Sequence, residues 1–168
     1  SHCHGTMVNG NFQGTFGDIG VFSTQERKLI GTGEGGFVLT NNEYLAMRIK
    51  ELRNFGKPAR QEFIDKGFAD QYGYLFGQNY RLGAFAAGVG IAQIDKLEKK
   101  IKQRTKNVQY YNRNLNTKFL KEIESIEGSR PNYYSVVYKV FHPNFSAFEL
   151  GEKLSEFGII SDTYRFKY

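Results

Sequence analysis

The chain has 168 residues, 40% of them hydrophobic and 24% charged, a length and composition typical of about one globular domain. No apolar stretch approaches the roughly 20 residues of a membrane-spanning helix, and no signal peptide is visible, so we expect a cytoplasmic protein that does not bind membranes. The single cysteine, Cys3, excludes an intrachain disulfide.

The first 40 residues predict short strands joined by turns. Residues 5–17 are rich in glycine and asparagine, which is typical of turns around short extended pieces. The apolar runs at 18–23 and 36–40 are each a candidate for a short buried strand. The loop between these two strands carries Lys28 and is rich in glycine.

Helices are expected further along the chain. Over residues 41–55, apolar side chains recur on one helical face, and Gly56 followed by Pro58 would end that helix. Residues 57–80 show no clean period and predict a long loop, which inside a domain is usually functional. A helix of small residues is expected over residues 84–93, where neighbouring elements can pack closely.

A long amphipathic helix comes next. Its apolar stripe has helical spacing and comprises Ile94, Leu97, Ile101, Val108, Tyr111 and Leu115. The densest basic run of this chain, whose net charge is +6, lies mostly off that stripe: Lys96, Lys99, Lys100, Lys102, Arg104 and Lys106. Clustered cations can neutralise nucleic-acid phosphates. The preferred interpretation is a solvated helix face, the alternative is a basic surface that attracts an anionic substrate or partner, and no nucleic-acid partner is expected.

The last third of the chain has a different pattern. Residues 133–140 alternate with a period of two, which predicts a strand. Ser146 and Glu149 have the spacing of a capping box at the start of a further helix, and residues 159–163 are one more strand candidate. Together these elements predict an α/β chain with a domain boundary inside the long helix.

The segment best suited to chemistry is 21–36, VFSTQERKLIGTGEGG. Gly31, Gly33 and Gly36 satisfy the G-x-G-x-x-G pattern of dinucleotide-binding loops, but that pattern needs a helix directly after it, and residues 36–40 predict a strand. A glycine-rich turn with an exposed lysine is a second interpretation. The third is a cofactor-binding lysine, because an amino group that loses its proton forms an imine with an aldehyde, and Ser23 could place a hydroxyl on a phosphate.

Four segments in series resemble the DegT/DnrJ/StrS family of sugar aminotransferases, which are fold-type I enzymes that use pyridoxal 5′-phosphate. The segments are SHCHGT, GTFGDIGVFSTQERKLIGTGEGGFVLTN, LRNFGK and QNYRLGAFAAGVGIAQIDKLEKKIKQR. The similarity continues weakly to the end of the chain. It implies that residues 1–95 are the C-terminal part of the large cofactor-binding domain, and that residues 96–168 are a linking helix and an incomplete small α/β domain.

The resemblance also implies roles for individual residues. Lys28 matches the lysine that joins the cofactor as an imine, Ser23 a serine that holds the cofactor phosphate, and His2 a residue beside the pyridine O3′. Without the resemblance, His2 reads as a histidine of a helix start or core. Asn79 matches an asparagine that reaches the phosphate of the neighbouring subunit, which implies a homodimer with shared sites. Arg81 would be an anion contact. For Asn79 and Arg81, loop capping and a surface ion pair are the alternatives, and no metal is implied.

Family members with histidine at the position of Lys28 are dehydratases, so the lysine favours transamination. The resemblance implies transfer of an amino group from glutamate or glutamine to a keto sugar, such as a nucleotide-linked 3- or 4-keto-6-deoxy sugar, or to a keto cyclitol. Gln25 and the SHCHG opening favour the branch that includes cyclitol- and aminobenzoate-forming members. The alternative is a family member that binds the cofactor without turnover, as a regulator.

Two departures from the family pattern concern the chain ends. The aspartate that pairs with the pyridine nitrogen in the family would precede Ser1, and the aromatic residue that stacks on the cofactor lies further upstream. The final small-domain strand is cut at Tyr168. We therefore interpret residues 1–168 as an internal fragment, and we expect the fragment alone to have negligible transaminase activity.

Overall fold

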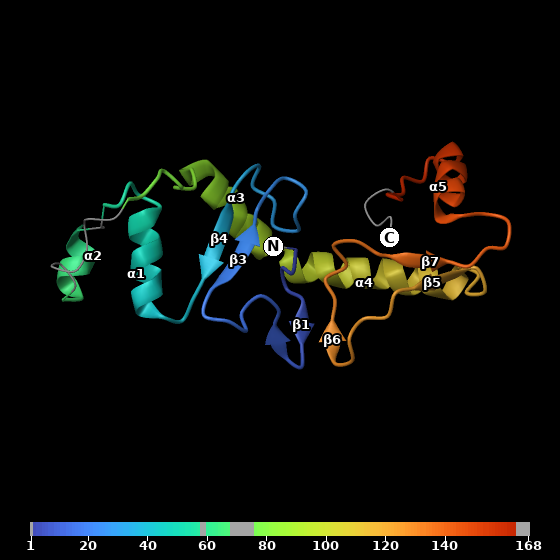
Figure 1. The fold of residues 1–168 in the computed structure, drawn as a ribbon, viewed down its shortest axis with the longest axis horizontal. Coiled ribbons are helices and arrows are strands. Elements are labelled where there is room, and N and C mark those ends of the chain that lie inside the picture. Colours follow the sequence, from blue (N-terminus) through green and yellow to red (C-terminus); the bar gives the residue numbers. More distant parts are fainter. Residues whose placement is uncertain (1, 58–59, 68–75, 164–168) are drawn as a thin grey trace.

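The structure is a computed structural model that describes residues 2–57, 60–67 and 76–163. In chain order the elements are β1 (Met7–Val8), β2 (Asn11–Phe12), β3 (Gly20–Ser23), β4 (Gly36–Leu39), α1 (Glu43–Leu52), α2 (Arg60–Asp65), α3 (Ala84–Ile94), α4 (Leu97–Asn114), β5 (Leu120–Glu122), β6 (Ser129–Arg130), β7 (Tyr138–Val140) and α5 (Ala147–Glu156). The molecule is elongated, with α1 and α2 at one end, α5 at the other and α4 between them (Figure 1). The mixture of helices and strands confirms the predicted α/β class.

The hairpin of β3 and β4 confirms the two strands predicted on either side of the lysine loop. The strands are antiparallel and pair Phe22 with Phe37 and Ser23 with Gly36. The rings of Phe22 and Phe37 stack with their centroids 4.9 Å apart, and Phe22 is buried. The hairpin therefore presents the end of β3, and the loop after it, at a fixed place.

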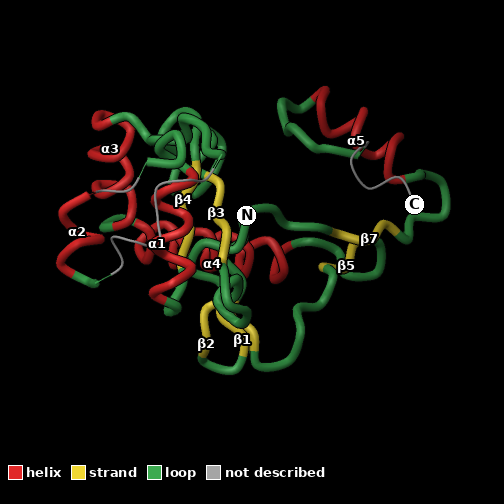
Figure 2. The backbone as a smooth tube through the Cα atoms, turned by 60° about the vertical axis from the view of Figure 1, so that its left-hand side comes forward, coloured by secondary structure: helices red, strands yellow, loops and turns green. Residues whose placement is uncertain are grey.

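A second small sheet joins the beginning of the chain to its later part. In the order β2-β1-β6, Met7 pairs with Phe12 on one side and with Arg130 on the other. The Arg130 guanidinium donates to the Gly5 carbonyl at 3.1 Å and to Glu98 on α4 at 3.0 Å. These contacts hold β6 against the N-terminal segment and α4, and β1 and β2 lie side by side at the lower edge of Figure 2.

Helix α4 contributes the buried stripe that its sequence predicts. Ile101 and Val108 are buried on it and join the small core that also holds Phe22, Leu29, Ile30 and Met47. Most of its basic side chains are exposed, but Lys100 is half-buried and its ammonium donates to the Leu29 carbonyl at 2.9 Å. Burial lowers the pKa of Lys100, and the neighbouring Lys96 and Arg104 charges lower it further.

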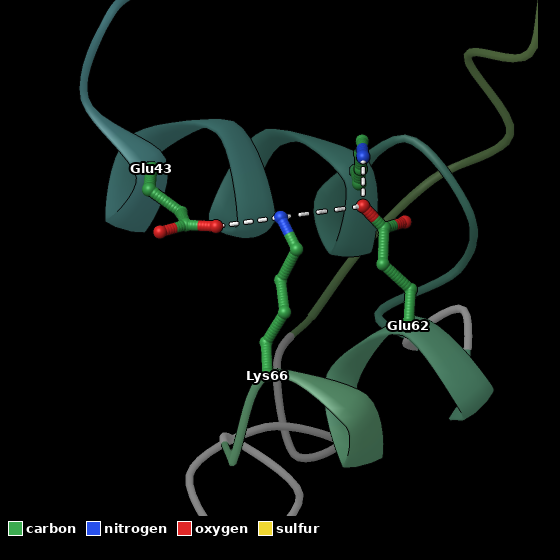
Figure 3. A network of polar contacts seen from close by, with 4 residues as sticks. Glu43, Glu62 and Lys66 are labelled. Carbon is green, nitrogen blue, oxygen red and sulfur yellow. Dashed lines mark hydrogen bonds and ion pairs between the residues drawn. The ribbon is translucent and has the colours of Figure 1, made fainter.

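Helix α1 confirms the helix predicted within residues 41–55, with Asn42 as its N-cap accepting from the Leu45 amide at 3.1 Å. The prediction of a loop over residues 57–80 is corrected, because part of that segment forms helix α2. Positions 58–59 and 68–75 of the segment lie outside the described residues. The ammonium of Lys66, just after α2, lies 2.6 Å from Glu43 and 3.8 Å from Glu62, so charges tie α2 to α1 (Figure 3). Such long-range pairing leaves no periodic pattern in the sequence.

The start of the long helix is corrected as well. Ile94, expected on its apolar stripe, is the last residue of α3, and the chain turns at Asp95 and Lys96 before α4 begins. Helix α3 confirms the predicted small-residue helix and is the more apolar of the two, but it has only 11 residues. No helix in the described ranges is both long and apolar enough to cross a bilayer.

Of two strand predictions near the end of the chain, one is confirmed in part and one is wrong. Within the predicted strand at 133–140, Tyr138–Val140 forms β7, whereas Tyr133 has a left-handed backbone with φ of 49°, which a regular strand does not contain. Residues 159–163 form no strand, and in the described structure no neighbouring strand pairs with them. The capping box at Ser146 and Glu149 is confirmed at the start of α5.

Candidate functional site

The loop that carries Lys28 joins β3 to β4, and we call residues 24–35 the Lys28 loop. Its two ends are closed by the Thr24 amide, which donates to the Gly35 carbonyl at 2.8 Å, and by the Thr32 amide, which donates to Thr24 at 2.8 Å. The Lys28 amide donates to Gln25 at 2.8 Å. The loop is therefore a compact turn held mainly by its own backbone.

Two buried side chains anchor this loop. Leu29 and Ile30, directly after Lys28, are 3% and 4% exposed and belong to the core. Lys28 itself is half-buried. Since its two successors are fixed in the core, the Lys28 side chain leaves the loop in a defined direction.

The amino group of Lys28 lies against two aromatic rings. Its Nζ is 2.5 Å from His2 Nε2 and 5.1 Å from the centre of the Tyr134 ring. The His2 and Tyr134 rings stack with centroids 4.3 Å apart and planes inclined by 28°. A protonated lysine can only donate, so in that state Nε2 is the unprotonated nitrogen of the imidazole. The structure thus brings together two predicted site residues, Lys28 and His2, and adds Tyr134.

The sequence pattern predicted Tyr134 on a regular strand and did not identify it as a site residue. It belongs to residues 131–134, which we call the tyrosine turn. Asn132, 6% exposed, donates through its side-chain amide to the carbonyls of His2 at 2.7 Å and of His4 at 3.0 Å. Its Oδ1 accepts from the Tyr134 amide at 2.9 Å. The only hint in the sequence was the N-Y-Y triplet, whose asparagine favours a turn.

His4 lies between the tyrosine turn and the hairpin. It is 2% exposed, and its ring packs on those of Phe22 and Phe37, with centroids 5.7 Å and 6.0 Å away. Burial lowers the pKa of His4 below its ordinary value of 6.5. His4 is therefore suited to a packing role in its neutral form.

Ser23, the last residue of β3, is half-buried and its Oγ accepts from the Gln25 amide at 3.3 Å. The Ser23 hydroxyl can still donate its own proton to an anion that binds beside the start of the Lys28 loop. Asn79 and Arg81 contact each other: the Arg81 guanidinium donates to Asn79 Oδ1 at 2.9 Å and lies 5.5 Å from the centre of the Phe55 ring. Asn79 also pairs with Asn54, just after α1.

These groups fit a small, flat, anionic aldehyde. Lys28 supplies the amine, Ser23 a hydroxyl, and the His2 and Tyr134 rings a planar wall. A pocket of about 560 Å³ opens beside His2 and Tyr134 and is also lined by Thr6, Gln13 and Ser135. Lys28 and Ser23 do not line this pocket, which adjoins the amine only through His2 and Tyr134.

Comparison with known proteins gives one consistent match. The model of the DegT/DnrJ/EryC1/StrS aminotransferase family matches residues 1–165. The L-glutamine:2-deoxy-scyllo-inosose aminotransferase of Streptoalloteichus tenebrarius is 31% identical over 144 residues, which cover 81% of this chain and 32% of that enzyme. The GDP-perosamine synthase of Vibrio cholerae is 33% identical over 111 residues, 66% of this chain and 28% of that enzyme.

A solved structure shares the fold. The Escherichia coli GDP-4-keto-6-deoxy-D-mannose-3-dehydratase with bound hydrated PLP superposes with a TM-score of 0.74 at 24% identity, over 92% of this chain and 42% of that one. The chain thus spans about a third of the length of its sequence relatives and less than half of this structure.

Proposed function

Because the chain belongs to the DegT/DnrJ/EryC1/StrS aminotransferase family, we propose that it carries the lysine part of a transaminase that places an amino group on a keto sugar or keto cyclitol. The observation that carries this proposal is the contact between Lys28 Nζ and His2 Nε2, which are 2.5 Å apart. Ser23 is the last residue of β3 and directly precedes the Lys28 loop. The relatives named for perosamine and inosose chemistry support the substrate class.

The cofactor of this proposal is pyridoxal 5′-phosphate, on which aminotransferases of the family depend. Lys28 would hold its aldehyde carbon, Ser23 its phosphate and His2 its ring hydroxyl. When bound, it supplies an electron sink for the negative charge that develops at the substrate α-carbon. Asn79, on the segment beside α1, would serve the phosphate of a neighbouring subunit in a homodimer, with Arg81 as a further anion contact.

The proposed proton transfers use Lys28 and its neighbour. Once the amino donor, glutamate or glutamine, has displaced it from the cofactor, Lys28 Nζ would be free to take the proton from the donor's α-carbon. With the acceptor bound, the same amine would return a proton to the carbon that receives the amino group. His2 Nε2, at 2.5 Å, accepts a hydrogen bond from Nζ and so orients the amino group. The Tyr134 ring lies on one side of this pair, with its centre 5.1 Å from Nζ.

Lys28 also favours transamination over dehydration, because the family resemblance implies that members with histidine at this position are dehydratases. We further propose that the two parts of the chain, residues 1–95 and 96–168, belong to the large and small domains of the complete enzyme. Helix α4, which starts at Leu97, would then link the two.

The test is steady-state transamination by the natural full-length protein, with glutamate or glutamine as donor and a panel of nucleotide-linked keto sugars and keto inositols as acceptors. Turnover that disappears in Lys28→Ala supports the proposal. Turnover that survives in Lys28→Ala contradicts it. Cofactor binding without turnover on any acceptor would favour the second candidate, a regulatory member of the family.

A further inference from the structure

We propose that Tyr134 belongs to the lysine site as a positioning residue that acts through His2, and that Asn132 holds both in place. This inference rests on the proposed function of Lys28. It concerns a part of the chain that lies about a hundred residues beyond the lysine and that contacts it only through folding.

His2 needs such support because its own segment has no regular structure. Residues 2 and 3 belong to no helix or strand, and the His2 side chain is exposed. Its backbone carbonyl is held by the Asn132 amide at 2.7 Å, and its ring is stacked on Tyr134 with centroids 4.3 Å apart. The tyrosine turn therefore fixes both the backbone and the ring plane of His2, and so directs Nε2 at Lys28 Nζ.

The tyrosine turn is itself built to hold one conformation. Tyr133 has φ of 49°, a left-handed backbone that a tyrosine adopts only when its surroundings impose it. Two hydrogen bonds hold the turn: the Arg104 guanidinium from α4 donates to the Tyr133 carbonyl at 2.8 Å, and Asn132 Oδ1 accepts from the Tyr134 amide at 2.9 Å. Backbone strain of this kind occurs at sites where the position of a side chain matters.

Tyr134 also faces the lysine directly. The ring centre lies 5.1 Å from Nζ, so the ring face bounds the side of the amino group next to His2 Nε2. The contribution of Tyr134 comes from the ring and not from the hydroxyl, because the stacking and the contact with Lys28 both involve the ring face.

The experiment measures the initial rate at which added pyridoxal phosphate becomes attached to Lys28 in the natural full-length protein freed of cofactor. Cyanoborohydride traps the adduct, and mass spectrometry of the Lys28 peptide quantifies it without any need for turnover. Tyr134→Leu should slow attachment about tenfold, the size of a coupling between contacting residues. Tyr134→Phe should keep the parent rate, and Asn132→Ala should resemble Tyr134→Leu.

The matched control is Tyr138→Leu. Tyr138 is also half-buried, four residues along, but its hydroxyl donates to Asn112 at 2.8 Å on the side of α4. A parent-like rate in this control, beside the slow Tyr134→Leu, supports the inference. Equal rates in Tyr134→Leu and the parent overturn it, and so do equal losses in Tyr134→Leu and Tyr138→Leu, which would indicate a general loss of structure.

A double-mutant cycle decides whether Tyr134 acts through His2. If it does, Tyr134→Leu should add little to the slowing already caused by His2→Ala. Effects that multiply would overturn the positioning role. If Lys28 of the parent is not labelled while other lysines are, the proposed function itself fails, and the inference fails with it.

Discussion

The Lys28 loop and the tyrosine turn meet at one amino group but are held in different ways. The loop is closed by short-range backbone bonds, such as that between Thr24 and Gly35, and is anchored by buried residues directly beside the lysine. The turn is held by contacts with distant parts of the chain: Arg104 on α4 donates to the Tyr133 carbonyl, and Asn132 of the turn donates to the His2 carbonyl. The reactive group is thus placed locally, whereas its surroundings are placed by tertiary contacts.

This difference predicts how substitutions spread. A change inside the Lys28 loop should cost stability at once, because the loop is part of the core. A change that loosens the tyrosine turn should cost little stability and act on the lysine instead. Changes at Leu29, Gly35, His4 and Arg104 test this division, from the largest expected effect to the smallest.

The largest effect is expected from Leu29→Ala. The Leu29 side chain is 3% exposed, so its loss leaves a cavity under the lysine and should lower the free energy of unfolding by about 2–5 kcal/mol. Urea denaturation of the natural full-length protein measures this. Leu39→Ala on β4 is the control, since Leu39 is 46% exposed and should cost far less. Equal costs for the two would show that the loop is not anchored in the core.

Gly35→Ala tests the closure of the loop. Gly35 has φ of 138°, and an added Cβ would lie 2.6 Å from Leu82 Cδ1, so we expect a loss of about 1–3 kcal/mol in unfolding free energy. Gly33→Ala is the matched control, because Gly33 also has a positive φ, 95°, but a Cβ there would meet nothing within 4 Å. The difference in unfolding free energy between Gly35→Ala and Gly33→Ala measures the cost of the close contact with Leu82 apart from that of backbone strain. Equal losses in the two variants would contradict the close packing of Leu82 on Gly35.

The pH dependence of stability tests His4, which packs between the two regions. Burial lowers its folded pKa below the ordinary 6.5, so the unfolded chain binds a proton near that pH that the folded protein does not. Its contribution is therefore complete above pH 6.5 and is lost as the pH falls through 6.5 toward the folded pKa. Below pH 6.5, the unfolding free energy should fall less steeply with decreasing pH in His4→Leu than in the parent. An unchanged dependence on pH would contradict the burial of His4.

The smallest effect on stability is expected from Arg104→Ala. Arg104 is exposed, so its removal should change the unfolding free energy by no more than about 1 kcal/mol. Because its guanidinium holds the Tyr133 carbonyl at 2.8 Å, attachment of pyridoxal phosphate to Lys28 should nevertheless slow. Lys102→Ala, exposed on the same helix, should change neither quantity. If pyridoxal phosphate became attached to Lys28 at the parent rate in Arg104→Ala, the proposed difference between the Lys28 loop and the tyrosine turn would be contradicted.

The same division explains what the sequence could predict. Periodicity and caps are local, so the β3–β4 hairpin, α1, α3, most of α4 and the capping box of α5 were all predicted. A motif and a family resemblance identified the candidate site residues Lys28, Ser23 and His2. Their roles remain predictions, as do those of Asn79 and Arg81. Only the proximity of Lys28 and His2 is now visible.

The failures share one physical cause. Residues 133–140 alternate as a strand does, and apart from Asn132 no local signal predicts the left-handed conformation of Tyr133, whose carbonyl accepts from the distant Arg104. Likewise α2 is tied to α1 by charges such as Lys66 and Glu43, which have no sequence period. Contacts across long stretches of chain decide these elements, and a single sequence does not encode them in any readable pattern.

The most direct test of the central claim is the visible absorbance spectrum of the natural full-length protein with pyridoxal phosphate, recorded beside that of Lys28→Ala. We predict that the parent shows the absorbance band of a lysine imine and that Lys28→Ala, folded to the same extent by circular dichroism, does not. Retention of the band in Lys28→Ala would mean that another lysine binds the cofactor, and would contradict the role assigned to Lys28.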